Sequence, residues 1–225
     1  MNGPGQSADT MNGVFITFEG NEGSGKSTQI ERLTARLGGL GREWITLREP
    51  GGTPIGEEIR HTLKHSAKNQ AMTPETELLL MSASRAQLVR EVVGPALKRG
   101  QIVVCDRFYD STTVYQGYGR GLDQGFISAL TAFAVGGTRP DLTLLLKVPL
   151  SVSLARRRAR AREAAVKVRD RFEESDDGFF ERIDAGYEAL ARAEPGRIQV
   201  IDATASVDAV AEAVWARVEP LVRTR

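Results

Sequence analysis

The stretch that decides the fold is Gly20-Asn21-Glu22-Gly23-Ser24-Gly25-Lys26-Ser27, which matches the pattern G-x-x-x-x-G-K-[ST] in full. An apolar run at residues 14–18 precedes it, and apolar residues at helical spacing follow it. In this context the glycines let backbone N–H groups turn around phosphate oxygens, and the following helix points its positive end at the same anion. We therefore predict a nucleotide-binding site in which Lys26 reaches the β- and γ-phosphates and the Ser27 hydroxyl ligates magnesium.

Apolar runs that predict strands alternate with helical patterns along the rest of the chain. Further strands are predicted at residues 44–47, 102–105, 142–148 and 198–201. Helices are predicted at residues 30–37, 55–64, 74–98 and 123–134, around residues 179–190, and at residues 207–218. Continuous apolar strands that alternate with helices are typical of a parallel sheet covered on both faces. We therefore predict an α/β fold of three layers with a five-stranded parallel sheet.

Composition limits the organisation and the partners. Residues 1–13 are polar and glycine-rich, which predicts a flexible tail without the apolar core of a signal peptide, followed by a single domain at residues 14–222. No apolar run of about 18 residues occurs, so no membrane span is expected. The 30 basic and 29 acidic residues give a net charge of +1, which indicates no nucleic-acid partner. Cys105 is the only cysteine, which excludes an intrachain disulfide and favours the cytoplasm.

The end of the third predicted strand narrows the class of phosphate-loop protein. A GTPase would need Asn-Lys-x-Asp and Asp-x-x-Gly motifs after the loop, and neither occurs. A motor ATPase would usually show Asp-Glu at the end of a buried strand, whereas this strand ends in Asp106-Arg107, which points to small-molecule kinases. We expect Asp106 to hold the magnesium shell, with a helix or turn cap as the alternative role.

Five further segments become informative together. They are Arg48-Glu49-Pro50-Gly51-Gly52-Thr53, Ser84-Arg85, Asp106-Arg107-Phe108, Ser111-Thr112-Thr113-Val114-Tyr115-Gln116-Gly117 and Asp170-Arg171-Phe172-Glu173. In this order and spacing they resemble thymidylate kinase in its bacterial form, over residues 14–218. The resemblance implies a P-loop nucleoside monophosphate kinase that uses ATP and Mg²⁺ to phosphorylate dTMP to dTDP in thymidine nucleotide biosynthesis, as a homodimer.

The resemblance also implies where the two nucleotides bind. The residues expected to hold ATP are Gly20, Asn21, Glu22, Gly23, Ser24, Gly25, Lys26, Ser27 and Thr28. The residues expected to hold the acceptor are Glu49, Arg60, Met81, Arg85, Arg107, Ser111, Thr112, Tyr115 and Gln116. Metal binding is expected at Ser27 and Asp106.

Roles at the acceptor phosphate and sugar follow from the same resemblance. Arg107 and Arg60 resemble the clamp on the acceptor's phosphate, a task for which the planar guanidinium is suited. Tyr115 resembles the ring that lies beneath the deoxyribose, and Glu22 the carboxylate that meets the 3′-hydroxyl. Two alternatives are a solvated helix charge for Arg60 and a plain core position for Tyr115.

At the base, Arg85 resembles the residue that hydrogen-bonds thymine, with Thr112 and Gln116 nearby; a solvated helix charge is the alternative for Arg85. Two positions depart from the family pattern. Met81 stands where the family usually has a phenylalanine that stacks on thymine, and a thioether can still lie on a ring face. Lys147 stands where the family usually has aspartate.

An arginine-rich stretch at about residues 153–175 is expected to form a lid, which anionic phosphates would draw shut. The resemblance implies a catalytic arginine in this lid, at Arg158, Arg160 or Arg162, beside the expected catalytic residues Lys26, Glu22 and Arg107. A basic surface for nucleic acid is the alternative for the lid. For the whole chain, the alternatives are a kinase for another nucleoside monophosphate and a non-catalytic nucleotide-dependent module. His61 and His65 lack a third metal ligand, which favours two exposed histidines.

Overall fold

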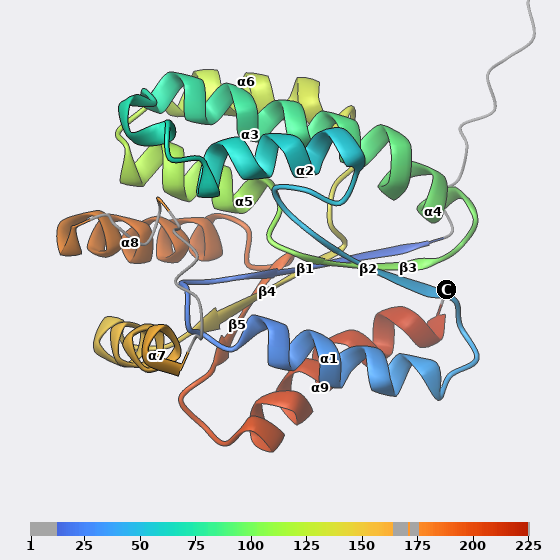
Figure 1. Ribbon diagram of the computed structural model, residues 1–225. Helices are drawn as coiled ribbons and strands as arrows, with labels where there is room; N and C mark the ends of the chain where they lie inside the picture. The colour runs from blue at the N-terminus through green and yellow to red at the C-terminus, as the bar shows by residue number, and fades with distance from the viewer. Residues whose placement is uncertain (1–12, 164–170, 172–175, 225) are drawn as a thin grey trace, which may run out of the picture.

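A computed structural model describes residues 13–163, 171 and 176–224 of the chain. Its centre is a five-stranded sheet in the order β2-β3-β1-β4-β5, and all neighbouring strands are parallel, as the sequence predicts (Figure 1). The strands are β1 (Val14–Glu19), β2 (Trp44–Arg48), β3 (Ile102–Asp106), β4 (Leu142–Lys147) and β5 (Ile198–Asp202). In the register of the sheet, Phe18 of β1 lies beside Asp106 of β3, so the ends of these two strands are level.

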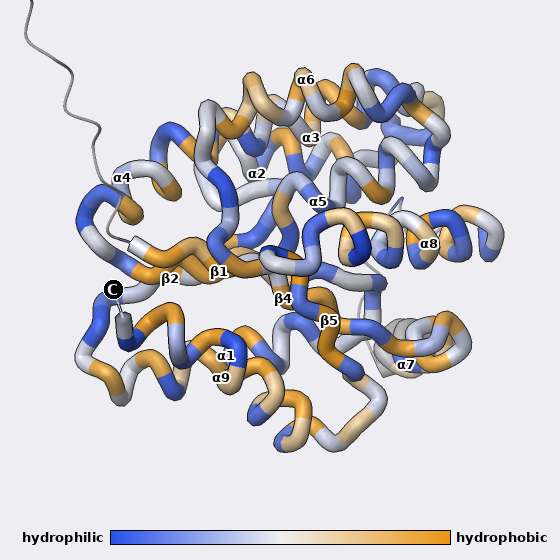
Figure 2. The backbone as a smooth tube through the Cα atoms, turned by 180° about the vertical axis from the view of Figure 1, so that it is seen from behind, coloured by the Kyte–Doolittle hydropathy of each residue, from blue (hydrophilic) through white to orange (hydrophobic). Residues whose placement is uncertain are grey.

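Strand β1 is buried along its whole length and supplies side chains to two cores. Val14, Ile16 and Phe18 pack in the core that α1 (Lys26–Gly38) and α9 (Val207–Thr224) cover. Phe15 points to the opposite face, where its ring meets that of Phe108 edge-on at 4.9 Å between centroids. Successive side chains of a strand point to opposite faces, so a run without polar alternation needs a helical layer on each side. Figure 2 shows hydrophobic residues along the sheet, between the layer with α1 and α9 and the layer with α3 and α6.

The predicted helices are present, and two of them contain a π-helical turn. The helix predicted at residues 55–64 comprises α2 (Pro54–Arg60) and a π turn (His61–His65). The helix predicted at residues 74–98 comprises α3 (Pro74–Leu88), a π turn (Val89–Val93) and α4 (Gly94–Lys98). The other predicted helices are α6 (Gln124–Val135) and α8 (Asp177–Ala193). Helix α7 (Leu150–Glu163) and a short 3₁₀ turn (Asn69–Ala71) form where the sequence predicted no helix. No helix of the described ranges is long and apolar enough to cross a bilayer.

A further helical segment that the sequence did not predict follows β3. Residues after β3 form α5 (Tyr109–Thr112) and continue as a π turn (Thr113–Gly119). Glycines and threonines have low helix propensity, so no helical pattern stands out in this stretch. Packing against α8 decides its conformation: a Cβ on Gly119 would lie 2.6 Å from the Phe179 ring, so only glycine fits there.

The position of the site follows from the topology. Strand β1 lies between β3 and β4, and the chain leaves β1 into α1 on one face of the sheet but leaves β3 into α5 on the other (Figure 1). A crevice at the carboxyl ends of the strands results where neighbouring connections diverge in this way, and ligands of open α/β sheets bind there. At the other end of β1, Gly13 is buried and its N–H donates to Leu97 O at 3.0 Å, so this residue of the expected tail belongs to the fold.

Candidate active site

The phosphate loop connects β1 to α1 and is built on three glycines with positive φ: Gly20 (130°), Gly23 (80°) and Gly25 (96°). A Cβ at Gly20 would lie 2.3 Å from Leu146 O, so a side chain is excluded there. Gly25 is the N-cap of α1 and caps it with no side chain, which leaves the first N–H groups of the helix to an incoming anion. The loop therefore presents backbone N–H groups to an incoming phosphate, and the nucleotide site expected here from the sequence stays a prediction.

Lys26 lies at the centre of this loop. Its ammonium donates to Gly20 O at 3.1 Å and to Asn21 O at 3.2 Å, and the side chain is buried. Burial lowers the pKa of Lys26, and the charge of Arg107 lowers it further. A phosphate anion would oppose both effects, because it supplies the negative charge that the loop carbonyls supply only in part.

The oxygens beside the loop fit a magnesium ion. Asp106 Oδ1 is buried without a hydrogen-bond partner, and Asp106 lines the same pocket as Ser27 and Lys26. No group of three or more His, Cys, Asp or Glu side chains among the described residues could hold a metal. A magnesium ion here would keep water and phosphate oxygens as its other ligands, which is its usual preference.

Arg107 is the only non-glycine residue of the described chain with positive φ (69°). This left-handed turn directly after β3 is held by a hydrogen bond from the Arg107 N–H to Phe18 O at 2.9 Å. The guanidinium donates to Ser111 Oγ (3.0 Å) and Glu22 Oε1 (3.1 Å), and it lies 5.1 Å from the centre of the Tyr115 ring. Residues in such strained conformations persist only where the surroundings enforce them, often at functional sites.

Glu19, which sequence reasoning did not single out, holds this turn. Its fully buried carboxylate accepts hydrogen bonds from the N–H of Phe108 (2.8 Å), from Ser111 Oγ (2.6 Å) and from Tyr187 OH (2.8 Å). Burial and the neighbouring Asp110 raise the pKa of Glu19. The only sequence signal was an acidic residue at the end of an apolar strand, and such a residue has many possible roles.

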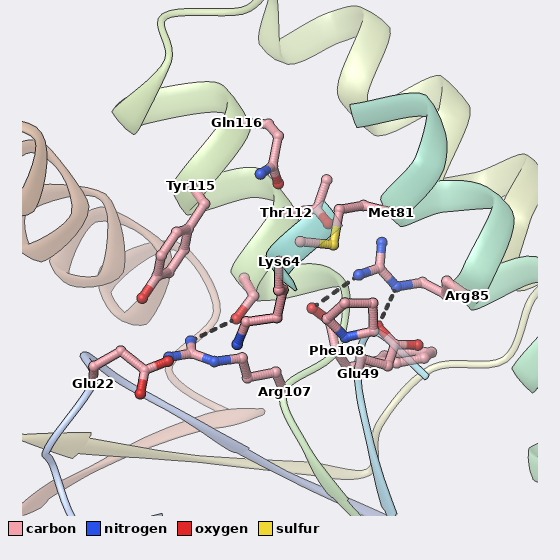
Figure 3. Close-up of a pocket in the computed structure, with 12 residues that line it drawn as sticks. Glu22, Glu49, Lys64, Met81, Arg85, Arg107, Phe108, Thr112, Tyr115 and Gln116 are labelled. Carbon is pink, nitrogen blue, oxygen red and sulfur yellow. Dashed lines mark hydrogen bonds and ion pairs between the residues drawn. The ribbon is translucent and has the colours of Figure 1, made fainter. Parts of the chain in front are cut away.

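Two pockets meet at Arg107. The inner pocket is lined by Glu22, Glu49, Pro50, Lys64, Met81, Arg85, Arg107, Phe108, Ser111, Thr112, Tyr115 and Gln116 (Figure 3). The loop pocket is lined by Glu22, Gly23, Gly25, Lys26, Ser27, Thr28, Arg48, Glu49, Arg60, Lys64, Asp106 and Arg107. Of the acceptor residues predicted from the sequence, all line the inner pocket except Arg60, which lines the loop pocket and donates to Pro50 O at 2.8 Å.

Arg85 and Glu49 form a buried ion pair in the wall of the inner pocket. Arg85 Nε donates to Glu49 Oε2 at 2.8 Å, and both side chains are at most 3% exposed. A solvated helix charge is therefore the wrong interpretation of Arg85. Arg85 Nη1 and Glu49 Oε1 are buried without partners, so one donor and one acceptor are left for a ligand of the inner pocket. Burial raises the pKa of Glu49 to about 7, although Arg85 acts to lower it.

Gln116 reaches the same pocket and is held from behind by Glu77. Its amide nitrogen donates to Glu77 Oε1 at 2.8 Å, and Glu77 is fully buried. The Glu77 carboxylate also pairs with Arg120 (3.2 Å) and with Arg171. A carboxylate only accepts hydrogen bonds, so it fixes the amide of Gln116 with its carbonyl oxygen toward the pocket, as Figure 3 shows.

Three comparisons with known proteins agree. A family model described as thymidylate kinase matches residues 18–214. The chain belongs to the thymidylate kinase family. It is 50% identical to the thymidylate kinase of Geobacter sulfurreducens over 202 residues, which cover 90% of this chain and 94% of that protein. It is 48% identical to the thymidylate kinase of Thermomicrobium roseum over 209 residues, which cover 93% of this chain and 96% of that protein. The crystal structure of thymidylate kinase from Ehrlichia chaffeensis superposes with a TM-score of 0.74 at 30% identity, covering 92% and 98% of the two chains.

The two positions that depart from the thymidylate kinase pattern, Met81 and Lys147, both pack against other parts of the protein. Met81 lines the inner pocket and packs against the core that contains Tyr115. Tyr115 itself lines the pocket and meets the Phe179 ring at 6.0 Å, so its pocket and core roles coexist. Lys147, at the end of β4, pairs with Glu188 and lies 3.8 Å from Asp184, both on α8. A lysine there therefore joins the sheet to α8.

The expected lid is described in part. Helix α7 carries Arg156, whose guanidinium donates to Gly23 O at 3.2 Å in the phosphate loop. The side chains of Arg158, Arg160 and Arg162 lie outside the described residues, as do residues 164–170 and 172–175.

The rings of His61 and His65 are 6.3 Å apart, and neither belongs to a candidate metal cluster among the described residues.

The first prediction concerns Glu77. Changing Glu77→Gln leaves the guanidinium groups of Arg120 and Arg171 without their shared countercharge, and each is at most 20% exposed. We expect the free energy of unfolding to fall by roughly 3 kcal/mol, the lower end of the range for a broken buried pair. Urea unfolding of the wild type and the variant measures this loss of unfolding free energy. Glu181→Gln, on the exposed side of α8, is the matched control. Equal stabilities of the two variants would contradict the prediction.

The second prediction concerns pH. A carboxyl with a raised pKa in the folded state stabilises the fold through its bound proton, and this contribution is lost as the pH rises from 4.5 through about 7. Relative to Glu49→Gln, the wild type should therefore gain about 1 kcal/mol of unfolding free energy per pH unit as the pH falls toward 5. Urea unfolding of both proteins across this range tests the sign, and parallel pH dependences would refute it.

Proposed function

We propose that the joined pockets transfer the γ-phosphoryl group of ATP in line to the 5′-phosphate of dTMP, which gives dTDP. Membership of the thymidylate kinase family supports this reaction. The observation that carries it is the position of Arg107, which lines both pockets at their junction. A donor phosphate in the loop and an acceptor phosphate at Arg107 would face each other without a barrier between them.

The donor side of the proposal rests on the phosphate loop. Lys26 and the N–H groups at the start of α1 would hold the β- and γ-phosphates. Ser27 and Asp106 would hold Mg²⁺, which supplies neutralisation of the charge on the phosphate oxygens when bound. The unpartnered Oδ1 of Asp106 supports this assignment.

The acceptor side rests on the inner pocket. Arg85 Nη1 would donate to a carbonyl of the base, and the Gln116 carbonyl would accept from a base N–H. Thymine offers both groups. Glu22 would meet the sugar: burial acts to raise its pKa, but the charges of Arg107, Lys26 and Lys64 lower it well below the usual range, so the carboxylate is ionised.

The transfer needs no covalent enzyme intermediate, because a phosphate oxygen is already a nucleophile. The protein aligns the two phosphates and neutralises their charge, and a positioned arginine is worth about 10³-fold or more in such reactions. Arg107 and Arg60 are the proposed arginines on the acceptor phosphate. Arg158, Arg160 and Arg162 remain the predicted source of a further one in the lid.

The third prediction tests the acceptor. With ATP and Mg²⁺, dTMP should have a higher kcat/KM than dUMP, UMP or AMP. Met81 in the inner pocket is the reason to consider another nucleoside monophosphate, and turnover of AMP equal to that of dTMP would end the thymidylate proposal. Lys26→Met provides the negative control: it should lose transfer by at least about 10²-fold while circular dichroism stays unchanged.

We also propose that the protein is a cytoplasmic homodimer. Its apolar surface supports the dimer: Leu79 on α3 and Phe126 and Phe133 on α6 are more than half exposed, and the two helices pack side by side. Large exposed apolar side chains gathered on adjacent helices are typical of an interface. A second copy of the chain would bury the same residues on both partners, because a two-fold interface is self-complementary. The single buried cysteine is compatible with the reducing cytoplasm.

The fourth prediction tests the dimer. Phe133→Glu places a charge in the proposed interface and should convert the protein from dimer to monomer in sedimentation velocity at micromolar concentration. Val200→Glu, on the edge strand β5 and also about half exposed, is the matched control and should remain dimeric. A wild type that sediments as a monomer would contradict the proposal.

A further inference from the structure

Lys64 occupies a position that none of the sequence motifs includes. Among the described residues, only Glu22, Glu49, Lys64 and Arg107 line both the inner pocket and the loop pocket. Figure 3 shows the Lys64 side chain directed to the same part of the inner pocket as the Arg107 guanidinium. An ammonium group is thus present where the two pockets join.

The backbone around Lys64 is held in place. The π turn that carries it closes with a hydrogen bond from Ser66 N–H to His61 O at 2.9 Å, and Leu63 is fully buried. Asn69, also buried, donates its amide to Leu63 O at 2.9 Å. This anchor fixes the helix end, so Lys64 emerges toward the pockets from a rigid base. π turns of this kind are frequent at functional sites.

The charged side chains where the two pockets join would bind a phosphate better with a cation in addition to Arg107. The Arg107 guanidinium already donates to Ser111, Tyr187 and Glu22, so much of its capacity is used within the protein. The Glu22 carboxylate beside it repels an incoming phosphate. Lys64 lines both pockets together with Glu22 and Arg107, so it contributes a second positive charge at this junction. Arg60, one helical turn before Lys64, lines only the loop pocket of these two.

We propose that Lys64 binds the 5′-phosphate of the acceptor nucleoside monophosphate together with Arg107. The inference rests on the proposed function, because it takes the inner pocket as the acceptor site. Lysine suits this place because its compact charge is carried on a long stem with three rotatable N–H donors, which can bind a phosphate from several directions. Lys64 is thus a specificity residue for the phosphorylated acceptor over the free nucleoside.

The fifth prediction compares two ligands that differ only in the phosphate. Isothermal titration of Lys64→Met should give a Kd for dTMP about tenfold higher than that of the wild type, as for one lost charge-assisted hydrogen bond. The Kd for thymidine, which has no phosphate, should change by less than about twofold. Lys64→Arg, which keeps the charge, should recover most of the dTMP affinity.

The controls distinguish a failure of the proposed role of Lys64 from a failure of the proposed reaction. Lys68→Met removes an exposed lysine four residues further on, outside both pockets, and should change neither Kd. Equal weakening of dTMP and thymidine by Lys64→Met, no weakening of either, or weakening of ATP alone would overturn the role of Lys64 while leaving the proposed reaction intact. A wild type that neither binds nor phosphorylates dTMP would instead refute the proposed function.

Discussion

The site depends on one buried carboxylate, Glu19 at the end of β1. Its oxygens accept from the backbone after β3, from the Ser111 hydroxyl and from Tyr187 on α8, so they tie two strands and a helix together at one point. A fully buried carboxylate is costly unless such partners surround it. Because Ser111 and Tyr187 also contact Arg107, the same carboxylate determines where the guanidinium at the junction of the pockets lies.

Around this point the protein divides its charges between two pockets. The loop pocket gathers Lys26, Arg48 and Arg60 with the oxygens of Ser27 and Asp106, which suits phosphates and their metal ion. The inner pocket has charged Glu22, Lys64 and Arg107 where it joins the loop pocket. Its other walls are apolar or neutral apart from the buried Arg85–Glu49 pair, which suits a base. An anionic acceptor group and a neutral ring therefore find opposite environments in adjoining spaces, and this contrast orients the acceptor before any chemistry takes place.

A second layer of buried ion pairs supports the side chains that face ligand. Glu77 joins Gln116 to Arg120 and Arg171, and Glu49 holds Arg85. Such networks define one geometry when every member has a partner, and the atoms left unpartnered are then the ones available to a ligand. Arg85 Nη1 and Glu49 Oε1 are atoms of this kind. Lys147 shows the same principle at the surface, where it links β4 to α8.

The sequence by itself determined the parallel sheet and the glycine-rich loop, and its resemblance to a family named most of the residues that line the inner pocket. Continuous apolar strands and a loop with all fixed glycines are local patterns, and local patterns have a physical meaning that does not depend on distant contacts. The tertiary structure alone decided the helix after β3, because packing against α8 overrides the weak propensity of residues 109–119. It also decided the positions of Glu19, Glu77 and Lys64, since a buried carboxylate or a lysine at the junction of two pockets has no sequence signature. The surroundings of such a residue depend on partners that are distant along the chain and are brought together only by folding.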